Sequence, residues 1–348
     1  MWDIQPDWKD LKSFYVCFGK SKYQIVRNDG ILSCTDSSVQ VDNLQKGSFT
    51  ISTKEGQCSF IAPKKIIQIH KGNSINCVDI SPNGNEILSG DSKGKLFLTY
   101  IGTEPVPLEG PTEDFDVEDC IFDPSHKLFF SCGGDFRIYE FSATEYTKTN
   151  RFDGHRSSVK HLDVKGDYLF SGSYDSTIIQ WDINRKQKVT TFQIGGRIND
   201  FCFTNNNVII SATESSLVAV DLKTGLPSAA PNTGNSGSAS FNSISSFNND
   251  VVTCTDEGEV IIWDIRNTDT PAGKWRWYDS PINKVRYTNN GRLFSLSNDG
   301  TTANIDVREQ KSLALLGTQA YAPAHDIAFN DVSAWVADGE GRLYNFDL

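Results

Sequence analysis

The sequence lacks the long apolar stretches of membrane and secreted proteins. No run approaches the roughly 20 consecutive apolar residues of a membrane-spanning helix. The opening segment, MWDIQPDWKD, carries no apolar core of the kind that a signal peptide requires. We therefore expect no association with a membrane.

The cysteines lack the spacing of a metal site. The closest two of the eight, Cys120 and Cys132, are twelve positions apart, so the sequence contains no Cys-x-x-Cys pair. Several fall in strand-like apolar stretches, where a free thiol behaves as a small apolar group. The pattern predicts no metal and no cofactor. It also indicates a reducing compartment, cytoplasmic or also nuclear.

Basic residues are outnumbered, with 33 Lys and Arg against 44 Asp and Glu and a net charge of −11. Binding to nucleic acid requires clustered basic side chains that neutralise phosphates, so we expect no nucleic-acid partner. The acidic balance suits a protein partner with a basic face. A well-solvated acidic surface is the alternative explanation.

Seven comparable segments recur along the chain. They are LTY (98–100), IYE (138–140), QWD (180–182), AVD (219–221), IWD (262–264), NID (304–306) and NFD (345–347). Their final residues are separated by 40, 42, 39, 43, 42 and 41 positions. A period of about 40 residues is typical of a β-propeller blade with four short strands. The spacing therefore predicts seven blades.

Each unit consists of short runs of β-branched and aromatic residues separated by turns. One unit reads VKHLDV (159–164), YLFSGS (168–173), TIIQWDI (177–183) and KVTTFQ (188–193). No long amphipathic helical pattern lies between units, which argues against an alternating strand–helix fold. The predicted fold class is all-β, a seven-bladed propeller with a small β-rich N-terminal domain.

Four polar or aromatic residues of this unit permit two explanations. His155, Ser171, Asp175 and Trp181 could belong to a hydrolytic site, or they could form an internal hydrogen-bond network. Their order resembles the hydrogen-bonding tetrad of WD40 blades, which implies a structural role. A nucleophilic serine needs an open face and an oxyanion hole, whereas Trp181 would fill the space that a substrate requires. We expect no enzyme.

The last unit contains three strand-like runs, and its fourth strand must come from elsewhere because an open blade would expose a sheet edge. Residues 64–69 (KKIIQI), directly ahead of the first unit, are the candidate. The prediction is a WD40 propeller over residues 59–348, closed by strand 64–69, in a chain that is monomeric by itself. Residues 1–58 form the β-rich N-terminal domain, with an eighth blade as the alternative.

Candidate partner-binding residues lie in the loops expected at the narrow face of the ring. They are Phe115, Asp116, Glu118, Tyr174, Asp256 and Glu257. The acidic run EDFDVED (113–119) could meet a basic partner, and aromatic residues are favoured anchors at interfaces. A solvated loop is the alternative for the acidic run.

Two further motifs have ordinary alternatives. KWRWY (274–278) mixes basic and aromatic residues like a nucleic-acid stacking platform, but its position favours a fourth strand followed by a loop. WDIR (263–266) resembles the box by which some propellers dock on the adaptor of a cullin ligase, but arginine at this position is also a plain surface residue.

Three stretches resemble one WD40 family in particular. DIQPDW (3–8), FIAPKKIIQIH (60–70) continuing into INCVDIS (75–81), and the terminal RLYNFDL look like the proteasomal ATPase-associated factor. The resemblance implies an assembly chaperone of the proteasome regulatory particle, which binds the C-terminal domains of ATPase subunits without a cofactor. By loop position it implies roles for Asp116, Glu118, Asp256 and Glu257. A generic WD40 scaffold, or a cullin-ligase substrate receptor acting through WDIR, is the alternative.

Overall fold

The structure is a computed structural model. It describes residues 63–100, 103–108, 115–205, 207–228, 230–231, 239–276, 278, 280–306, 311–316 and 322–347. For residues 306 and 311–316, and for six strands between residues 13 and 61, it describes the backbone alone. The opening segment, Glu113, Asp114 and Trp277 lie outside the described residues, so the acidic run and KWRWY are described only in part.

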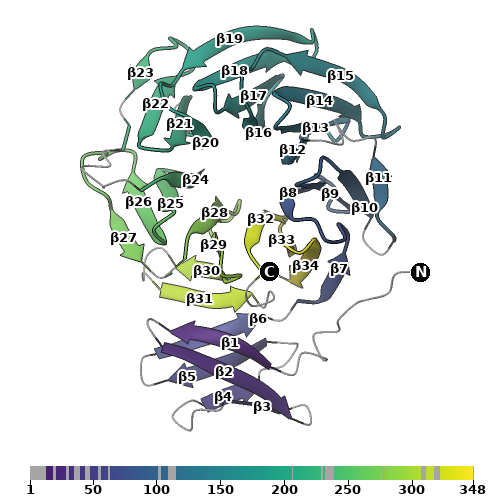
Figure 1. Ribbon diagram of the computed structural model, residues 1–348. Helices are drawn as coiled ribbons and strands as arrows, with labels where there is room; N and C mark the ends of the chain where they lie inside the picture. The colour runs from purple at the N-terminus through teal and green to yellow at the C-terminus, as the bar shows by residue number, and fades with distance from the viewer. Residues whose placement is uncertain are drawn as a thin grey trace.

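The first three blades form one half of a ring of sheets (Figure 1). Blade one contains β8 (Ile75–Ile80), β9 (Glu86–Asp91), β10 (Leu96–Tyr100) and β11 (Val106–Leu108). Blade two contains β12 (Val117–Phe122), β13 (Leu128–Gly133), β14 (Arg137–Ser142) and β15 (Lys148–Asp153). Blade three contains β16 (Val159–Lys165), β17 (Tyr168–Ser173), β18 (Thr177–Asp182) and β19 (Gln187–Gln193).

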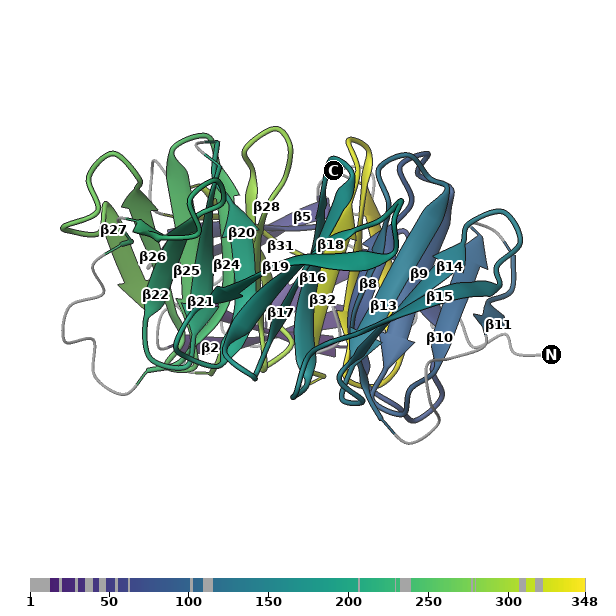
Figure 2. The same cartoon turned by 90° about the horizontal axis from the view of Figure 1, so that it is seen from above.

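Blades four to six continue the ring in the same order. Blade four contains β20 (Ile198–Phe203), β21 (Val208–Thr213), β22 (Leu217–Asp221) and β23 (Pro227–Ser228). Blade five contains β24 (Phe241–Phe247), β25 (Asp250–Thr255), β26 (Glu259–Asp264) and β27 (Gly273–Arg276). Blade six contains β28 (Ile282–Tyr287), β29 (Leu293–Ser297), β30 (Thr302–Asp306) and β31 (Lys311–Leu316). Within every blade the neighbouring strands are antiparallel, and the first strand lies innermost (Figure 1). Figure 2 shows the ring edge-on, with β9 and β10 of blade one running between its two faces.

Blade seven is built from both ends of the propeller sequence. It contains β32 (Ala324–Phe329), β33 (Ser333–Asp338), β34 (Arg342–Asp347) and, as its outer strand, β7 (Lys65–Gln68). β34 pairs with β7 in antiparallel register, from Arg342 opposite Gln68 to Asn345 opposite Lys65. The pairing supplies backbone partners to an edge that would otherwise be open, and it joins segments about 280 residues apart. The predicted seven-bladed fold is confirmed.

The N-terminal strands extend blade six rather than adding a sector to the ring. β1 (Ser13–Phe18), β2 (Ser21–Asn28) and β3 (Ile31–Cys34) form a separate three-stranded sheet. β4 (Gln40–Asn43), β5 (Ser48–Thr53) and β6 (Gly56–Ile61) continue the sheet of blade six, because β6 pairs in parallel with β31. β6 runs across the boundary placed between residues 58 and 59 in the sequence.

The core lies between neighbouring blades. One apolar cluster joins blades one and two through residues such as Leu88, Leu98, Val117 and Phe129, and another joins blades seven and one. The period-two pattern of a strand places one face of each blade against the blade before it and the other face against the blade after it. Each blade is therefore buried on both faces, which explains why fully buried Phe and Trp side chains occur around the ring.

Candidate protein-binding face and its supporting interior

The structure brings His155, Ser171, Asp175 and Trp181 together in blade three. His155 Nδ1 lies 2.9 Å from Asp175 Oδ2, and His155 Nε2 lies 2.7 Å from Ser171 Oγ. Trp181 Nε1–H donates to the same Ser171 oxygen at 2.8 Å. This chain of bonds ties the loop before β16 to the turn after β17 and to β18.

Ser171 has the surroundings of a structural residue. Its side chain is fully buried, and the indole of Trp181 is also buried. Burial opposes ionisation of Asp175, but hydrogen bonds from His155, Thr177 and the backbone N–H of Arg156 hold the pKa of this carboxyl below its usual range. An ionised Asp175 fixes the orientation of the imidazole, and no open face is left at the hydroxyl for a substrate.

Other blades retain part of this network. In blade one, His70 bonds Asp91 and Ser89, both at 2.9 Å, but Thr99 stands at the tryptophan position. Four other blades carry a serine or threonine equivalent to Ser171, of which Ser131, Ser211 and Thr253 have no hydrogen-bond partner within the described part of the chain. In blade five Trp263 Nε1 is also unpaired among these residues. The fourth, Ser295 of blade six, lies 2.7 Å from Tyr278 Oη, so among the described residues the serine is bonded to a histidine in blades one and three and to a tyrosine in blade six.

A second network, which the sequence analysis missed, connects the blades around the ring. The second residue of the innermost strand donates its side-chain amide to the first carbonyl of the next blade. Asparagine makes this bond in four blades, at 2.9–3.1 Å: Asn76 to Val117, Asn199 to Phe241, Asn242 to Ile282 and Asn283 to Ala324. This network could have been predicted from the sequence, because asparagine recurs at the second position of these four strands.

Glu118 and Lys160 occupy the equivalent position in blades two and three, and they form an ion pair with each other. Their side chains are 15% and 20% exposed, so the pair is mostly withdrawn from solvent. Burial lowers the pKa of Lys160, but the carboxylate of Glu118 more than offsets this effect and the pKa is raised. Glu118 therefore completes an inter-blade contact, and its charge is already neutralised within the chain.

Three aspartates on innermost strands, which line the central channel of the ring, accept hydrogen bonds from backbone N–H groups on the innermost strand of the next blade. Asp119 accepts a hydrogen bond from Leu162 N at 2.8 Å, Asp200 from Ile244 N at 3.2 Å, and Asp326 from Val78 N at 3.0 Å. Each pair joins one blade to the next, and the last crosses the closure of the ring. Because an unpaired buried N–H is costly, these aspartates stabilise the inner edge that faces the channel.

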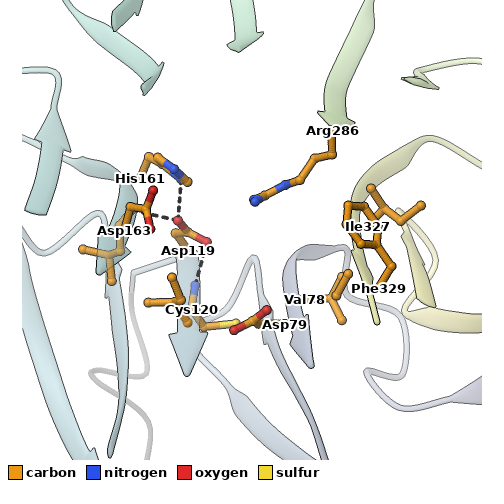
Figure 3. A pocket seen from close by; sticks show the side chains of 12 residues that line it. Val78, Asp79, Asp119, Cys120, His161, Asp163, Arg286, Ile327 and Phe329 are labelled. Carbon is orange, nitrogen blue, oxygen red and sulfur yellow. Dashed lines mark hydrogen bonds and ion pairs between the residues drawn. The ribbon is translucent and has the colours of Figure 1, made fainter. Parts of the chain in front are cut away.

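Opposite charges meet in a channel cavity of about 140 Å³ (Figure 3). His161 lies 2.7 Å from Asp119 and 3.2 Å from Asp200, and Arg286 extends from β28 into the cavity. Burial raises the pKa of Asp79 to about 7, whereas the pKa of Asp200 is lowered because His161 and Lys284 outweigh its burial. The cavity has room for a few water molecules, and its charges chiefly connect blades.

The narrow face of the ring consists of the loops that enter the first strands and the turns between the second and third strands. In every blade a backbone bond joins the two: Gly134 N to Asp116 O, Tyr174 N to Ser158 O and Asp256 N to Ser240 O are examples, at 3.0–3.2 Å. The structure therefore brings Phe115, Asp116, Tyr174, Asp256 and Glu257 to one face.

These five residues differ in their availability to a partner. Asp256 and Glu257 are exposed, and Phe115 is 47% exposed. Asp116 and Tyr174 are half-buried. Cationic groups flank the Tyr174 ring, with Lys160 Nζ 5.0 Å and the Arg197 guanidinium 5.9 Å from its centroid. Asp256 and Glu257 of blade five are therefore the two exposed carboxylates among these five residues, while Lys160 beside Tyr174 is already paired with Glu118.

Two remaining motifs have local explanations. Lys274, Trp275 and Arg276 lie on β27, the fourth strand of blade five, as their position in the sequence predicted. The Arg266 guanidinium of WDIR bonds both carboxylate oxygens of Asp264, two residues earlier, and holds the pKa of Asp264 down at about 2. Arg266 thus has a partner in its own turn.

The described residues contain no group of three or more His, Cys, Asp or Glu side chains arranged to hold a metal ion. In the same part of the chain, no helix has the length and apolar character needed to cross a bilayer.

Two segments match the family model described as "WD domain, G-beta repeat", residues 62–98 and 146–182. These segments contain His70 and His155, so the match falls on the two blades in which a histidine bonds the buried serine. The structure is similar to that of the RRP9 WD40 repeats, with a TM-score of 0.72 and 15% identity over 83% of this chain and 98% of that one.

Two curated proteins are similar to this chain in sequence over part of its length. Transcription factor unc-37 of Caenorhabditis elegans is 25% identical over 44% of this chain, which spans about a quarter (26%) of that protein. Eukaryotic translation initiation factor 3 subunit I of Drosophila melanogaster is 22% identical over 68% of this chain and 77% of its own length. Together, the two repeat matches and the seven blades show that the fold of this chain is that of a WD40 propeller.

Proposed function

We propose that the chain is a non-catalytic protein-binding module that uses its narrow face to hold a partner with a basic surface. Asp256 and Glu257 carry this proposal, because they are exposed neighbouring carboxylates in one turn of that face. Opposite charge on a partner would raise the association rate and the specificity of binding. His155, Ser171 and Trp181 of blade three are engaged in hydrogen bonds within the chain, which favours a binding role over a catalytic one.

We further propose that the partners are the C-terminal domains of proteasomal ATPase subunits, and that the chain acts as an assembly chaperone of the regulatory particle in the cytoplasm or also the nucleus. The support is the resemblance of residues 3–8, 60–70 and 75–81 to the proteasomal ATPase-associated factor. The curated relatives named above are a transcription factor and a translation initiation factor subunit. In this mechanism the chain covers one surface of the ATPase subunit and so prevents it from docking too early. The chain leaves when another contact competes for the same surface.

The experiment measures binding of the purified chain to a panel of isolated proteasomal ATPase C-terminal domains. We expect at least one domain to bind, and the double variant Asp256→Lys, Glu257→Lys to weaken binding, more strongly at low salt. The matched control is Glu145→Lys with Asp331→Lys, which makes the same change of charge at exposed residues on the opposite face. No binding by any domain would overturn the ATPase assignment. Equal binding by the two double variants would overturn the role of blade five.

A further inference from the structure

In blade two, a turn of the narrow face places Phe136 in a left-handed backbone conformation that bulky residues rarely adopt. In six blades the turn between the second and third strands closes with the same backbone bond, at 3.1–3.4 Å, and its last residue has a positive φ. The residues at this position are Gly94, Phe136, Ser176, Gly258, Gly300 and Gly341. Blade two therefore places a phenylalanine where four other blades place glycine.

Phe136 has φ +69°, a value that a bulky side chain rarely adopts. The phenyl ring is only partly covered in return, because Phe136 is 43% exposed. A strained backbone with an exposed apolar side chain is unfavourable for the isolated chain, and strain of this kind is concentrated at functional sites. Folding alone does not account for phenylalanine at this position.

A second exposed phenylalanine lies in the loop that packs against this turn. Phe115 is 47% exposed, and its ring approaches the turn so closely that a Cβ on Gly134 would meet Phe115 Cδ1 at 3.6 Å. Six large apolar side chains are exposed among the described residues: Val106, Phe115, Phe136, Val189, Leu226 and Val332. The two phenylalanines in this set both belong to blade two and to the narrow face.

Close backbone packing holds the Phe115 loop against the Phe136 turn. Gly134 N donates to Asp116 O at 3.1 Å, and a Cβ on Gly133 would lie 1.9 Å from the same oxygen. The loop carrying Phe115 is therefore pressed against the turn carrying Phe136. Beneath it, Asp135 accepts a hydrogen bond from Tyr139 Oη at 2.6 Å, which anchors the turn to β14.

We propose that Phe115 and Phe136 form an aromatic anchor that inserts into an apolar cleft on a basic protein partner. Exposed aromatic side chains held rigidly by their backbone are effective hot spots, because little conformational entropy is lost on binding. We expect a positively charged partner because the net charge of the chain is −11 and Asp116 lies beside Phe115. Arg137, next to Phe136, does not change this expectation, because it is paired with Asp153 at 3.3 Å. This inference rests on the proposed narrow-face function and identifies its apolar centre.

The test compares Phe136→Gly and Phe115→Ser with Val189→Ser and Val332→Ser, which alter exposed apolar residues away from the narrow face. Binding to the ATPase C-terminal domains is measured by calorimetry, and the melting temperature is measured for each variant. We expect both phenylalanine variants to bind at least ten-fold more weakly and both valine variants to bind normally. Phe136→Gly should melt at the same temperature as the parent or higher, because glycine is the residue that equivalent turns contain.

The outcomes separate this inference from the proposed function. Binding that is weakened by the Asp256 and Glu257 reversals but not by Phe136→Gly would overturn the aromatic anchor alone. If no ATPase domain binds, a photoreactive phenylalanine analogue is placed at position 136 and cross-linked to proteins in a cell extract. The same analogue at position 189 is the control for the amount of cross-linked protein. A cross-linked protein that then binds the purified chain directly, and ten-fold more weakly after Phe136→Gly, would support the anchor. Cross-linking no stronger than at position 189 would overturn it.

Discussion

The hydroxyl of Ser171 allows a direct test of whether the polar interior is structural. Its Oγ is bonded to His155 Nε2 at 2.7 Å and to Trp181 Nε1 at 2.8 Å, in a site with no exposure to solvent. Replacement by alanine leaves two buried polar groups without their partner. At roughly 1–3 kcal/mol for each such group, the expected loss of unfolding free energy is about 2–6 kcal/mol.

Ser211 provides the matched control for this substitution. It occupies the equivalent position of blade four and is equally buried, but its hydroxyl has no hydrogen-bond partner among the residues that the structure describes. We expect Ser211→Ala to change the unfolding free energy by less than about 0.5 kcal/mol or to stabilise the chain. The same chemical change is therefore expected to be costly in blade three and nearly neutral in blade four, because of these two hydroxyls only that of blade three is hydrogen-bonded among the described residues.

Scanning calorimetry and urea unfolding measure the difference. At about 2 °C per kcal/mol for a chain of this size, Ser171→Ala should lower the melting temperature by roughly 4–12 °C, while Ser211→Ala should leave it nearly unchanged. Equal melting temperatures for the two variants would refute the structural reading of the tetrad.

Two further predictions concern the channel and the closure of the ring. Burial raises the pKa of Asp79 from 3.8 to about 7, so Asp79 reduces stability progressively as the pH rises from about 4 to 7. Asp79→Asn keeps an oxygen for the bond from Phe122 N, and its gain in melting temperature should therefore be larger at pH 8 than at pH 5; an equal gain at both would contradict the assignment. Deletion of residues 64–69 removes the outer strand of blade seven and should give aggregated protein, whereas a soluble, folded product would show that β7 does not close the ring.

The ring could be predicted from the sequence because a propeller is periodic. Each unit of about 40 residues repeats the same strand order, so the number of blades follows from counting strand ends such as Trp181–Asp182 and Trp263–Asp264. The tetrad of blade three could be predicted for the same reason, since its four residue types stand at fixed offsets within one unit. Both inferences use local spacing, which the sequence displays directly.

Contacts between units were harder to predict. Glu118 was named as a candidate partner-binding residue, and nothing in the sequence indicated its ion pair with Lys160, which stands at the same position of the next blade and is brought to Glu118 by the inter-blade register. The pairing of β6 with β31 joins segments about 255 residues apart, with no sequence signal for a parallel contact. The strain at Phe136 was also hidden, because its positive φ follows from the turn geometry.

Amide hydrogen exchange on the complex with a bound ATPase C-terminal domain shows which surface of the propeller the partner covers. We expect slower exchange in the loop at residues 115–116 and in the turns at residues 133–136 and 255–258 of the narrow face. We also expect unchanged exchange along β15 and β19, the long outer strands of blades two and three. Protection confined to those outer strands, with none on the narrow face, would contradict this expectation.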